Sequence, residues 1–236
     1  MMSSAEVVRR IMTAQAPVLL LDTCSLLDLM RDPTRETFTA EQVQAAHHLL
    51  VKAESRPPKL WIPIAGQVLA ERHEHQLNVK QEAETAIRKL EECVNRVQRT
   101  MAAHGLKTTA VSPTLVESNF PDTASRMVDQ YFSAGLHVQN PRDIERKAYA
   151  RIAANKAPSK KGQQAKDCVV IESYLHIARK LREHQFKQQI VFLTTNTRDY
   201  SERAGSGKLH PDLVAEFHAV NMAYAVNFTM AKHLLA

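Results

Sequence analysis

Residues 17–25 read Pro17-Val18-Leu19-Leu20-Leu21-Asp22-Thr23-Cys24-Ser25, an apolar run closed by an acidic residue. A short continuous apolar run of this kind is typical of a strand in a parallel sheet that is covered on both faces. Similar runs are expected to form strands at residues 60–64, 189–194 and 222–226. Helical patterns separate these runs, which predicts βαβ units and an α/β fold with a mainly parallel sheet.

Helices are predicted from apolar residues that recur at three- and four-residue steps. The predicted ranges are 26–30, 39–53, 65–104, 123–134, 141–155, 165–184 and 229–235. The helix over 65–104 is longer than most globular helices, so we expect it to break once or to project from the body. Its apolar face is interpreted as packed within the domain, with a dimer interface as the alternative. The whole chain is interpreted as one domain, 1–236, with a helical insertion over 72–160.

The composition is that of a globular, helix-rich protein. Of 236 residues, 44% are hydrophobic and 24% are charged, and only 6 are glycine, which argues against an all-β fold with many tight turns. Cys24, Cys93 and Cys168 are widely spaced, so they are interpreted as buried thiols in a reducing compartment. No apolar stretch approaches the roughly 20 residues of a membrane-spanning helix, which predicts a soluble cytoplasmic protein without a membrane partner.

Acidic and amide side chains stand at the ends of the predicted strands. Asp22 follows the first strand, Asn196 and Asp199 follow the strand at 189–194, Glu71 lies early in the helix after the second strand, and Asp167 begins a later helix. In open parallel sheets such positions converge beyond the carboxyl ends of the strands. Clustered carboxylates repel one another and imply a bound divalent cation, and oxygen ligands suit Mg²⁺ or Mn²⁺. The alternative is that each residue is a helix cap or turn residue.

This ordered set resembles the PIN-domain nucleases. It is most similar to the larger PIN-like subgroup that carries a helical insertion between the second and third acidic positions. The resemblance implies a Rossmann-like three-layer fold and hydrolysis of RNA with Mg²⁺ or Mn²⁺. Many members of the family are toxin ribonucleases that pair with an antitoxin, and others process or degrade RNA.

The resemblance also implies roles for individual residues. Asp22, Glu71 and Asp167 match the first three acidic metal-site positions. The fourth position departs from the common pattern, because Asn196 stands there and Asp199 follows three residues later. Either Asp199 takes the metal-facing role or the site has three carboxylates. Small hydroxyl residues that surround the site in the family are matched by Thr23, Ser25 and Thr194, which could equally be turn and cap residues.

The positive charge is concentrated in one block between positions 142 and 166. The block holds eight basic residues against Asp143 and Glu145, so its net charge equals the +6 of the whole chain. The basic residues are Arg142, Arg146, Lys147, Arg151, Lys156, Lys160, Lys161 and Lys166. Basic residues next to an acidic metal site can grip the phosphates that flank a scissile bond. Lys160, Lys161 and Lys166 are therefore predicted phosphate contacts, and a solvated helix face with an exposed loop is the alternative.

Together these features predict a metal-dependent endoribonuclease. Asp22, Glu71, Asp167 and Asp199 are the predicted catalytic residues, and Asp22, Glu71, Asp167 and Asn196 the predicted metal ligands. A first alternative is a catalytically degenerate PIN-like module that binds RNA or protein, which Asn196 keeps open. A second alternative is a phosphohydrolase that acts on small molecules. An antitoxin and a second copy of the chain are both open as protein partners.

Overall fold

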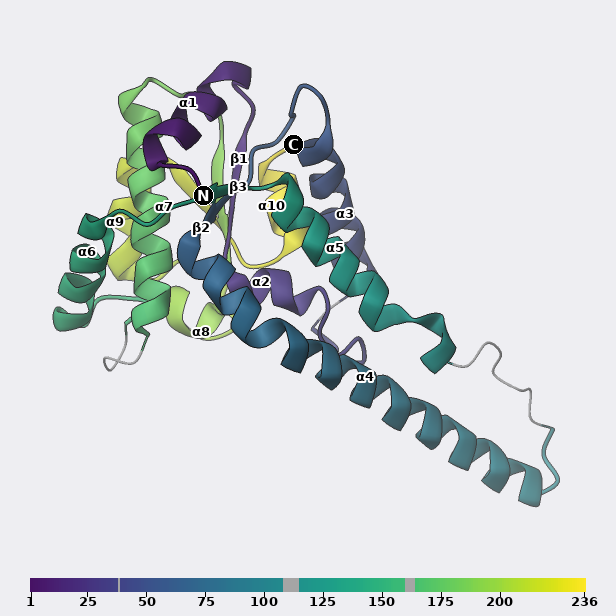
Figure 1. Cartoon of the computed structure of the whole chain (residues 1–236). Coiled ribbons are helices and arrows are strands. Elements are labelled where there is room, and N and C mark those ends of the chain that lie inside the picture. The colour runs from purple at the N-terminus through teal and green to yellow at the C-terminus, as the bar shows by residue number, and fades with distance from the viewer. Residues whose placement is uncertain (38, 108–114, 160–163) are drawn as a thin grey trace.

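A central parallel sheet organises the molecule (Figure 1). The computed structural model describes residues 1–37, 39–107, 115–159 and 164–236. Across these residues the strands are β1 (Val18–Leu21), β2 (Pro63–Ala65), β3 (Leu136–Val138), β4 (Ile190–Leu193) and β5 (Met222–Ala225). Each strand pairs with its neighbour in parallel, as the sequence predicts.

Two hydrogen-bonded groups of strands join at the start of β1. β1, β4 and β5 pair in that order, and β2 pairs with β3. A parallel bridge between Val18 and Trp61, with the Leu19 N–H donating to the Trp61 carbonyl at 2.8 Å, links the two groups. The strand order is therefore β3-β2-β1-β4-β5, and the chain reverses direction across the sheet between β1 and β4. In sheets of this kind, ligands bind at the carboxyl ends of the two strands that flank the reversal.

Helices cover both faces of the sheet, which confirms the predicted three-layer α/β architecture (Figure 1). On one face α7 packs against α1 and α6, and on the other α3 packs against α5 and α10. The first group is α1 (Ser4–Ala14), α6 (Arg142–Ala153), α7 (Ala165–Glu183) and α9 (Pro211–Ala219). The second group is α3 (Ala40–Glu54), α5 (Phe120–Ala134) and α10 (Phe228–Leu234). The short helices α2 (Thr23–Asp28) and α8 (Thr197–Tyr200) follow β1 and β4.

Phe192 of β4 is the centre of the core beside α7. Its ring lies 5.9 Å from that of Tyr174, 5.2 Å from that of Tyr200 and 6.0 Å from that of Phe217, centre to centre. Rings at these separations add to the free energy gained by burial. The Tyr174 hydroxyl also donates to the Leu21 carbonyl at 2.6 Å, which fixes the carboxyl end of β1.

Some elements have no counterpart in the sequence prediction. β3 has only three residues, too few for a periodic pattern, and lies within the segment 72–160 that the sequence predicts to be helical. α1 begins with a capping box between Ser3 and Glu6, and α9 begins with Pro211 at its first position. β2 begins at Pro63, where a missing N–H is tolerated, rather than at residue 60. Cys93 is exposed, so the prediction of a buried thiol is wrong there.

Helix α4 (Gly66–Ala103) is a single unbroken helix of 38 residues that projects from the body of the domain (Figure 1). α5 runs back along its first half, and Arg72 of α4 pairs with Asp129 of α5. Ile87 is buried, but Leu90, Val97 and Met101 are 41%, 50% and 38% exposed. The prediction that the whole apolar face packs within the domain is therefore wrong for the outer half of the helix, as far as the described residues extend.

No helix in the described ranges is both long and apolar enough to cross a membrane.

The close approach of β2 and α5 at Gly135 gives a test of the packing. A Cβ atom at Gly135 would lie 3.1 Å from the Tyr131 carbonyl oxygen and would also collide with the side chain of Ile64, and both residues are fully buried. Gly135→Ala should lower the free energy of unfolding by about 1–3 kcal/mol, measured by urea titration. Gly207→Ala is the matched control, because no atom lies within 4 Å of its added Cβ. Equal stability of the two variants would contradict this packing.

Candidate active site

Asp22 lies at the carboxyl end of β1 and is the N-cap of α2. One carboxylate oxygen accepts from the Thr23 N–H at 2.7 Å, and the other accepts from the Thr194 hydroxyl at 2.7 Å and from the Cys24 thiol at 3.1 Å. The side chain is almost fully buried. Burial raises the pKa of Asp22, the two side-chain hydrogen bonds oppose that rise, and the charge of Glu71 adds to it. Asp22 is thus both the N-cap of α2 and a candidate site residue.

The other predicted carboxylates gather around Asp167 in the first turn of α7. Burial and then the charges of Asp22, Glu71 and Asp199 raise the pKa of Asp167 to about 8. Glu71 and Asp199 are themselves buried, at 8% and 9% exposure. Residues from β1, α4, α7 and α8 therefore lie close enough to repel one another, although they are far apart in the sequence.

The carboxylates are near one another but are not arranged around a single metal position. In the described residues, no group of three His, Cys, Asp or Glu side chains is already arranged to hold a metal ion. Mg²⁺ keeps several water ligands and commonly binds through one or two carboxylates, so it does not require a closed cage of protein oxygens. Buried oxygen donors with an excess of negative charge fit such an ion, since a cation would relieve the repulsion that raises the pKa of Asp167.

Asn196 and Asp199 form one unit after β4. The Asn196 side-chain amide donates to the Asp199 carboxylate at 3.0 Å, and the Asn196 backbone N–H donates to the Thr194 hydroxyl oxygen at 3.0 Å. Of the two, Asp199 brings the charge that acts on Asp167. Asn196 holds the Asp199 carboxylate in place.

The three predicted hydroxyl residues differ in their surroundings. Thr194 donates directly to Asp22. Ser25 donates to the Leu193 carbonyl at 3.3 Å and accepts from the Thr195 N–H at 3.0 Å, so it joins α2 to the end of β4. The Thr23 hydroxyl is buried and has no hydrogen-bond partner among the described residues.

Two buried tyrosines support the site and were not predicted. The Tyr200 hydroxyl donates to the Asp167 carbonyl at 3.1 Å, and Tyr174 holds the Leu21 carbonyl next to Asp22. Each fixes the backbone at a candidate site residue. Neither the composition nor the spacing of the sequence signals these contacts, because each joins residues more than 30 positions apart.

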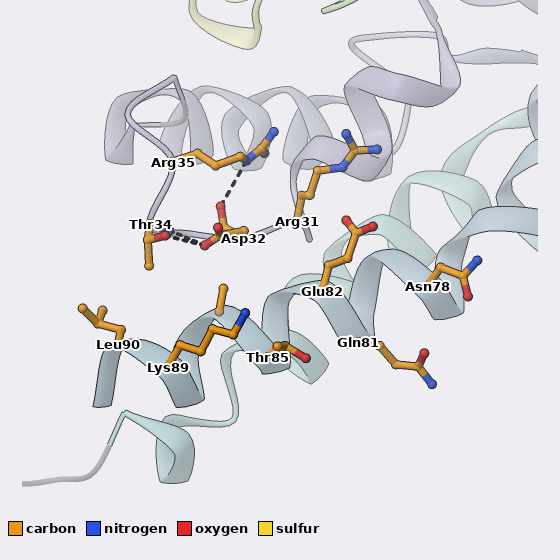
Figure 2. A pocket seen from close by; sticks show the side chains of 11 residues that line it. Arg31, Asp32, Thr34, Arg35, Asn78, Gln81, Glu82, Thr85, Lys89 and Leu90 are labelled. Atoms are coloured by element: carbon orange, nitrogen blue, oxygen red, sulfur yellow. Dashed lines mark hydrogen bonds between the residues drawn. The ribbon is translucent and has the colours of Figure 1, made fainter. Parts of the chain in front are cut away.

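A hollow of about 490 Å³ opens beside Asn196 and Cys24. Its other walls come from the connection between α2 and α3, the start of α3, the loop after β4 and the loop after β5. The lining residues there are Asp28, Arg31, Arg35, Thr37, Gln42, Thr195, Thr197, Val226 and Asn227. A second hollow of about 950 Å³ lies between the α2–α3 connection and α4, and Arg31 and Arg35 line it as well (Figure 2).

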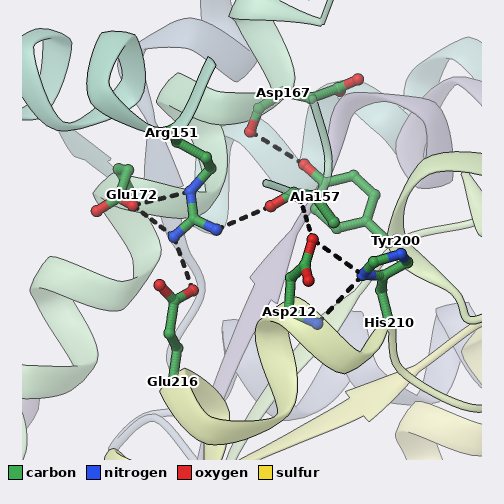
Figure 3. A network of polar contacts seen from close by, with 8 residues as sticks. All are labelled: Arg151, Ala157, Asp167, Glu172, Tyr200, His210, Asp212 and Glu216. Carbon is green, nitrogen blue, oxygen red and sulfur yellow. Dashed lines mark hydrogen bonds and ion pairs between the residues drawn. The ribbon is translucent and has the colours of Figure 1, made fainter. Parts of the chain in front are cut away.

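The predicted basic block is partly neutralised inside the protein. Arg151 is buried, and its guanidinium donates to Glu172 at 2.5 and 2.9 Å, to Glu216 at 2.7 Å and to the Ala157 carbonyl at 2.8 Å (Figure 3). Its inclusion in a basic surface is therefore wrong. The ammonium of Lys147 pairs with Asp143 at 3.1 Å.

Of the three predicted phosphate contacts, only Lys166 lies among the described residues. Lys166 is exposed next to Asp167, and its ammonium lies 2.5 Å from Glu74. Lys160 and Lys161 lie outside the described residues.

Comparison with known protein families identifies a match. A family model described as PIN domain matches residues 19–200, from β1 to the end of α8. This range includes Asp22, Glu71, Asp167 and Asp199. A search of curated proteins and a search of solved structures found no significant match.

The raised pKa of Asp167 predicts a pH dependence of stability in the absence of divalent cations. An unfolded chain ionises its aspartates near pH 4, at about 3.9, whereas the pKa of folded Asp167 is about 8. Between these values the folded protein binds more protons than the unfolded one, so the free energy of unfolding should fall as pH rises. Urea titrations in EDTA from pH 5 to pH 8 should show this fall, and Asp167→Asn should reduce it.

Asp143→Asn is the matched control for this pH series. The hydrogen bond from Lys147 lowers the pKa of Asp143, so that carboxylate stays ionised across the range and its removal should leave the slope unchanged. If the free energy of unfolding of Asp167→Asn changes with pH as steeply as that of the unsubstituted protein, the carboxylates do not cluster around Asp167.

The buried ion network predicts a large effect of removing its cation. Arg151→Leu leaves Glu172 buried without its partner, which should lower the free energy of unfolding by about 3–5 kcal/mol in urea titrations. Lys147→Ala, on the same helix, breaks an exposed pair and should cost about 1 kcal/mol or less. Similar losses of stability in the two variants would show that Arg151 is not buried in this way.

Proposed function

Because the chain belongs to the PIN-domain family, we propose that it is a metal-dependent endoribonuclease. Members of this family are generally nucleases that act on nucleic acid with divalent metals. The observation that carries the proposal is the convergence of Asp22, Glu71, Asp167 and Asp199 at the point where the sheet reverses its strand order. Structural ion pairs do not account for this cluster, because the charges that act on Asp167 are all negative.

The proposed metal ligands are Asp22, Glu71 and Asp167, with Asp199 as the fourth carboxylate. Mg²⁺ or Mn²⁺ bound there would activate water and stabilise the charge that develops at the scissile phosphate. Asn196 would orient Asp199 through its amide, as it does in the structure. This arrangement assigns Asn196 a supporting role, so its lack of charge does not by itself remove activity.

The protein's own hydrogen bonds prepare Asp22 for this role. Thr194 and the Thr23 N–H each donate to a different carboxylate oxygen of Asp22, which limits its rotation and favours its ionised form. The oxygen that accepts from the Thr23 N–H keeps a further lone pair, so the ionised carboxylate can still bind a cation. Thr23 and Ser25 are proposed to line the substrate position beside Asp22.

Lys166 is the proposed phosphate contact next to the carboxylates. Its pairing with Glu74 is between exposed groups, and such a pair contributes little to stability, so a phosphate can compete for the ammonium. We extend the same proposal to Lys160 and Lys161. A cytoplasmic setting is proposed from the three free cysteines, which suit a reducing compartment.

Cleavage of RNA tests the proposal directly. The protein should cut a labelled single-stranded RNA in Mn²⁺ or Mg²⁺ and not in EDTA, leaving 5′-phosphate and 3′-hydroxyl ends. Asp167→Asn should lower kcat by more than about 100-fold, because it removes a proposed ligand, whereas Asn196→Ala should lower activity by about 10- to 100-fold, as is usual for a residue that orients a ligand. Gel analysis of the products and of their ends measures both effects.

Asp143→Asn serves as the control, since it removes a carboxylate outside the cluster. Cleavage that survives chelation or the Asp167→Asn substitution would refute metal-dependent hydrolysis at this site. RNA binding without turnover in any divalent metal would favour the degenerate PIN-like binding module. A single-stranded DNA of the same sequence shows whether the activity is specific for RNA.

A further inference from the structure

The two hollows described above adjoin at Arg31 and Arg35. The smaller hollow borders the candidate site at Asn196, and the larger one continues along α4 as far as Leu90. Figure 2 shows the α2–α3 connection as one wall of the larger hollow and α4 as the other. Since the same two arginines line both hollows, the hollows are adjacent. Together they are called the groove, which extends from Asn196, beside the candidate site, to Leu90 of α4.

The side chains along the groove are those that contact a sugar-phosphate backbone. Apart from its charged residues, the groove is lined mainly by residues with hydroxyl and amide side chains. Together with Arg and Lys, these groups make most of the hydrogen bonds that proteins form to phosphate and sugar. Examples on the two walls of the larger hollow are Thr34, Asn78, Gln81 and Thr85. None of the described residues that line either hollow is aromatic, so base stacking on rings does not contribute here.

Two acidic residues that line the hollows, Asp28 at the end of α2 and Asp32 of the α2–α3 connection, are occupied by internal contacts. Asp28 accepts from the Arg35 guanidinium at 3.1 Å, and Asp32 accepts from the Thr34 N–H and hydroxyl at 2.8 and 2.7 Å. These contacts shape the wall of the groove and hold Arg35 in place. Glu82 is the one carboxylate that α4 contributes to the described lining.

Two cations on opposite walls are exposed to solvent and can reach a ligand. Arg31 forms an ion pair with the Asp28 carboxylate through its buried Nε, at 3.7 Å, while 37% of its side chain stays exposed. Lys89 is exposed on α4 and forms no ion pair with any residue that the structure describes. One cation lies near the smaller hollow, and the other lies at the far end of the larger one.

We propose that this groove is the path of a single-stranded RNA that extends from the carboxylate site, with Arg31 and Lys89 contacting its phosphates. The proposal rests on the endoribonuclease function only for the identity of the ligand. It places the RNA between the α2–α3 connection and α4 rather than along α6. A guanidinium plane can also stack on an unpaired base, which gives Arg31 and Arg35 a second mode of contact.

Binding measured without cleavage separates this proposal from the catalytic one. Fluorescence anisotropy of a labelled 15-nucleotide RNA, in EDTA and with Asp167→Asn in every protein, gives the affinity as a function of salt. Arg31→Ala combined with Lys89→Ala should weaken binding at least about tenfold, because each change removes a charge-assisted hydrogen bond to phosphate. The slope of log affinity against log salt should also fall by about 0.7 for each phosphate that the protein no longer neutralises.

The control pair is Lys59→Ala with Lys187→Ala. These exposed lysines precede β2 and β4, at the amino ends of the strands and so at the opposite edge of the sheet from the carboxylates. The two control substitutions remove the same charge as the groove pair. They should leave both the RNA affinity and its salt dependence nearly unchanged. Lys89→Ala alone is a further variant that an exposed helix position tolerates, and it should lower the slope by about 0.7.

If the groove pair and the control pair weaken RNA binding equally, the proposed RNA path along the groove is wrong. The test of catalysis is independent of this outcome. Weakening confined to the groove pair supports the proposed path, even where the unsubstituted protein cleaves no RNA. A trinucleotide, which is too short to extend far along α4, should bind the Lys89→Ala and unsubstituted proteins alike. Sensitivity of the trinucleotide to Lys89→Ala would overturn the assigned direction of the path.

Discussion

The parallel pairing of β1 with β4 is the constraint on which the rest of the structure depends. Their register places Leu21 opposite Leu193, so both strands end at the same level and Asp22 leaves the sheet beside Thr194. A buried carboxylate is costly unless it is hydrogen-bonded, and this register supplies the Thr194 hydroxyl as a partner. Because Asp22 also caps α2, the same pairing sets the start of the α2–α3 connection that forms one wall of the groove.

The sequence predicts which carboxylates lie close together better than it predicts the residues that surround them. The proximity of Asp22, Glu71, Asp167 and Asp199 could be predicted because a parallel sheet brings the carboxyl ends of its strands, and the first turns of the helices that run back along it, to one edge. The charges that raise the pKa of Asp167 are those of the other three. The supporting contact from Tyr200 could not be identified, since it depends on packing between distant segments.

Net charge along the sequence is a poor guide to charge on the surface. Arg151 belongs to the most basic stretch of the chain, yet its guanidinium is buried between Glu172 and Glu216, which lie 21 and 65 positions away. Only the fold brings these acids to it. Arg31 shows the converse, because it lies in a stretch with no excess of charge and still lines both hollows beside the site.

The unbroken helix α4 connects the candidate site to the groove mechanically. Glu71 lies in its second turn, and Lys89 lies 18 positions further on, which corresponds to about 27 Å along a straight helix. No loop intervenes, so the distance between the carboxylate and the distal cation is fixed by helix geometry. α5 packs along the first half of α4 and stabilises its direction through contacts such as the ion pair between Arg72 and Asp129. Although its outer half projects from the domain, α4 therefore sets the spacing between the carboxylates and the far end of the groove.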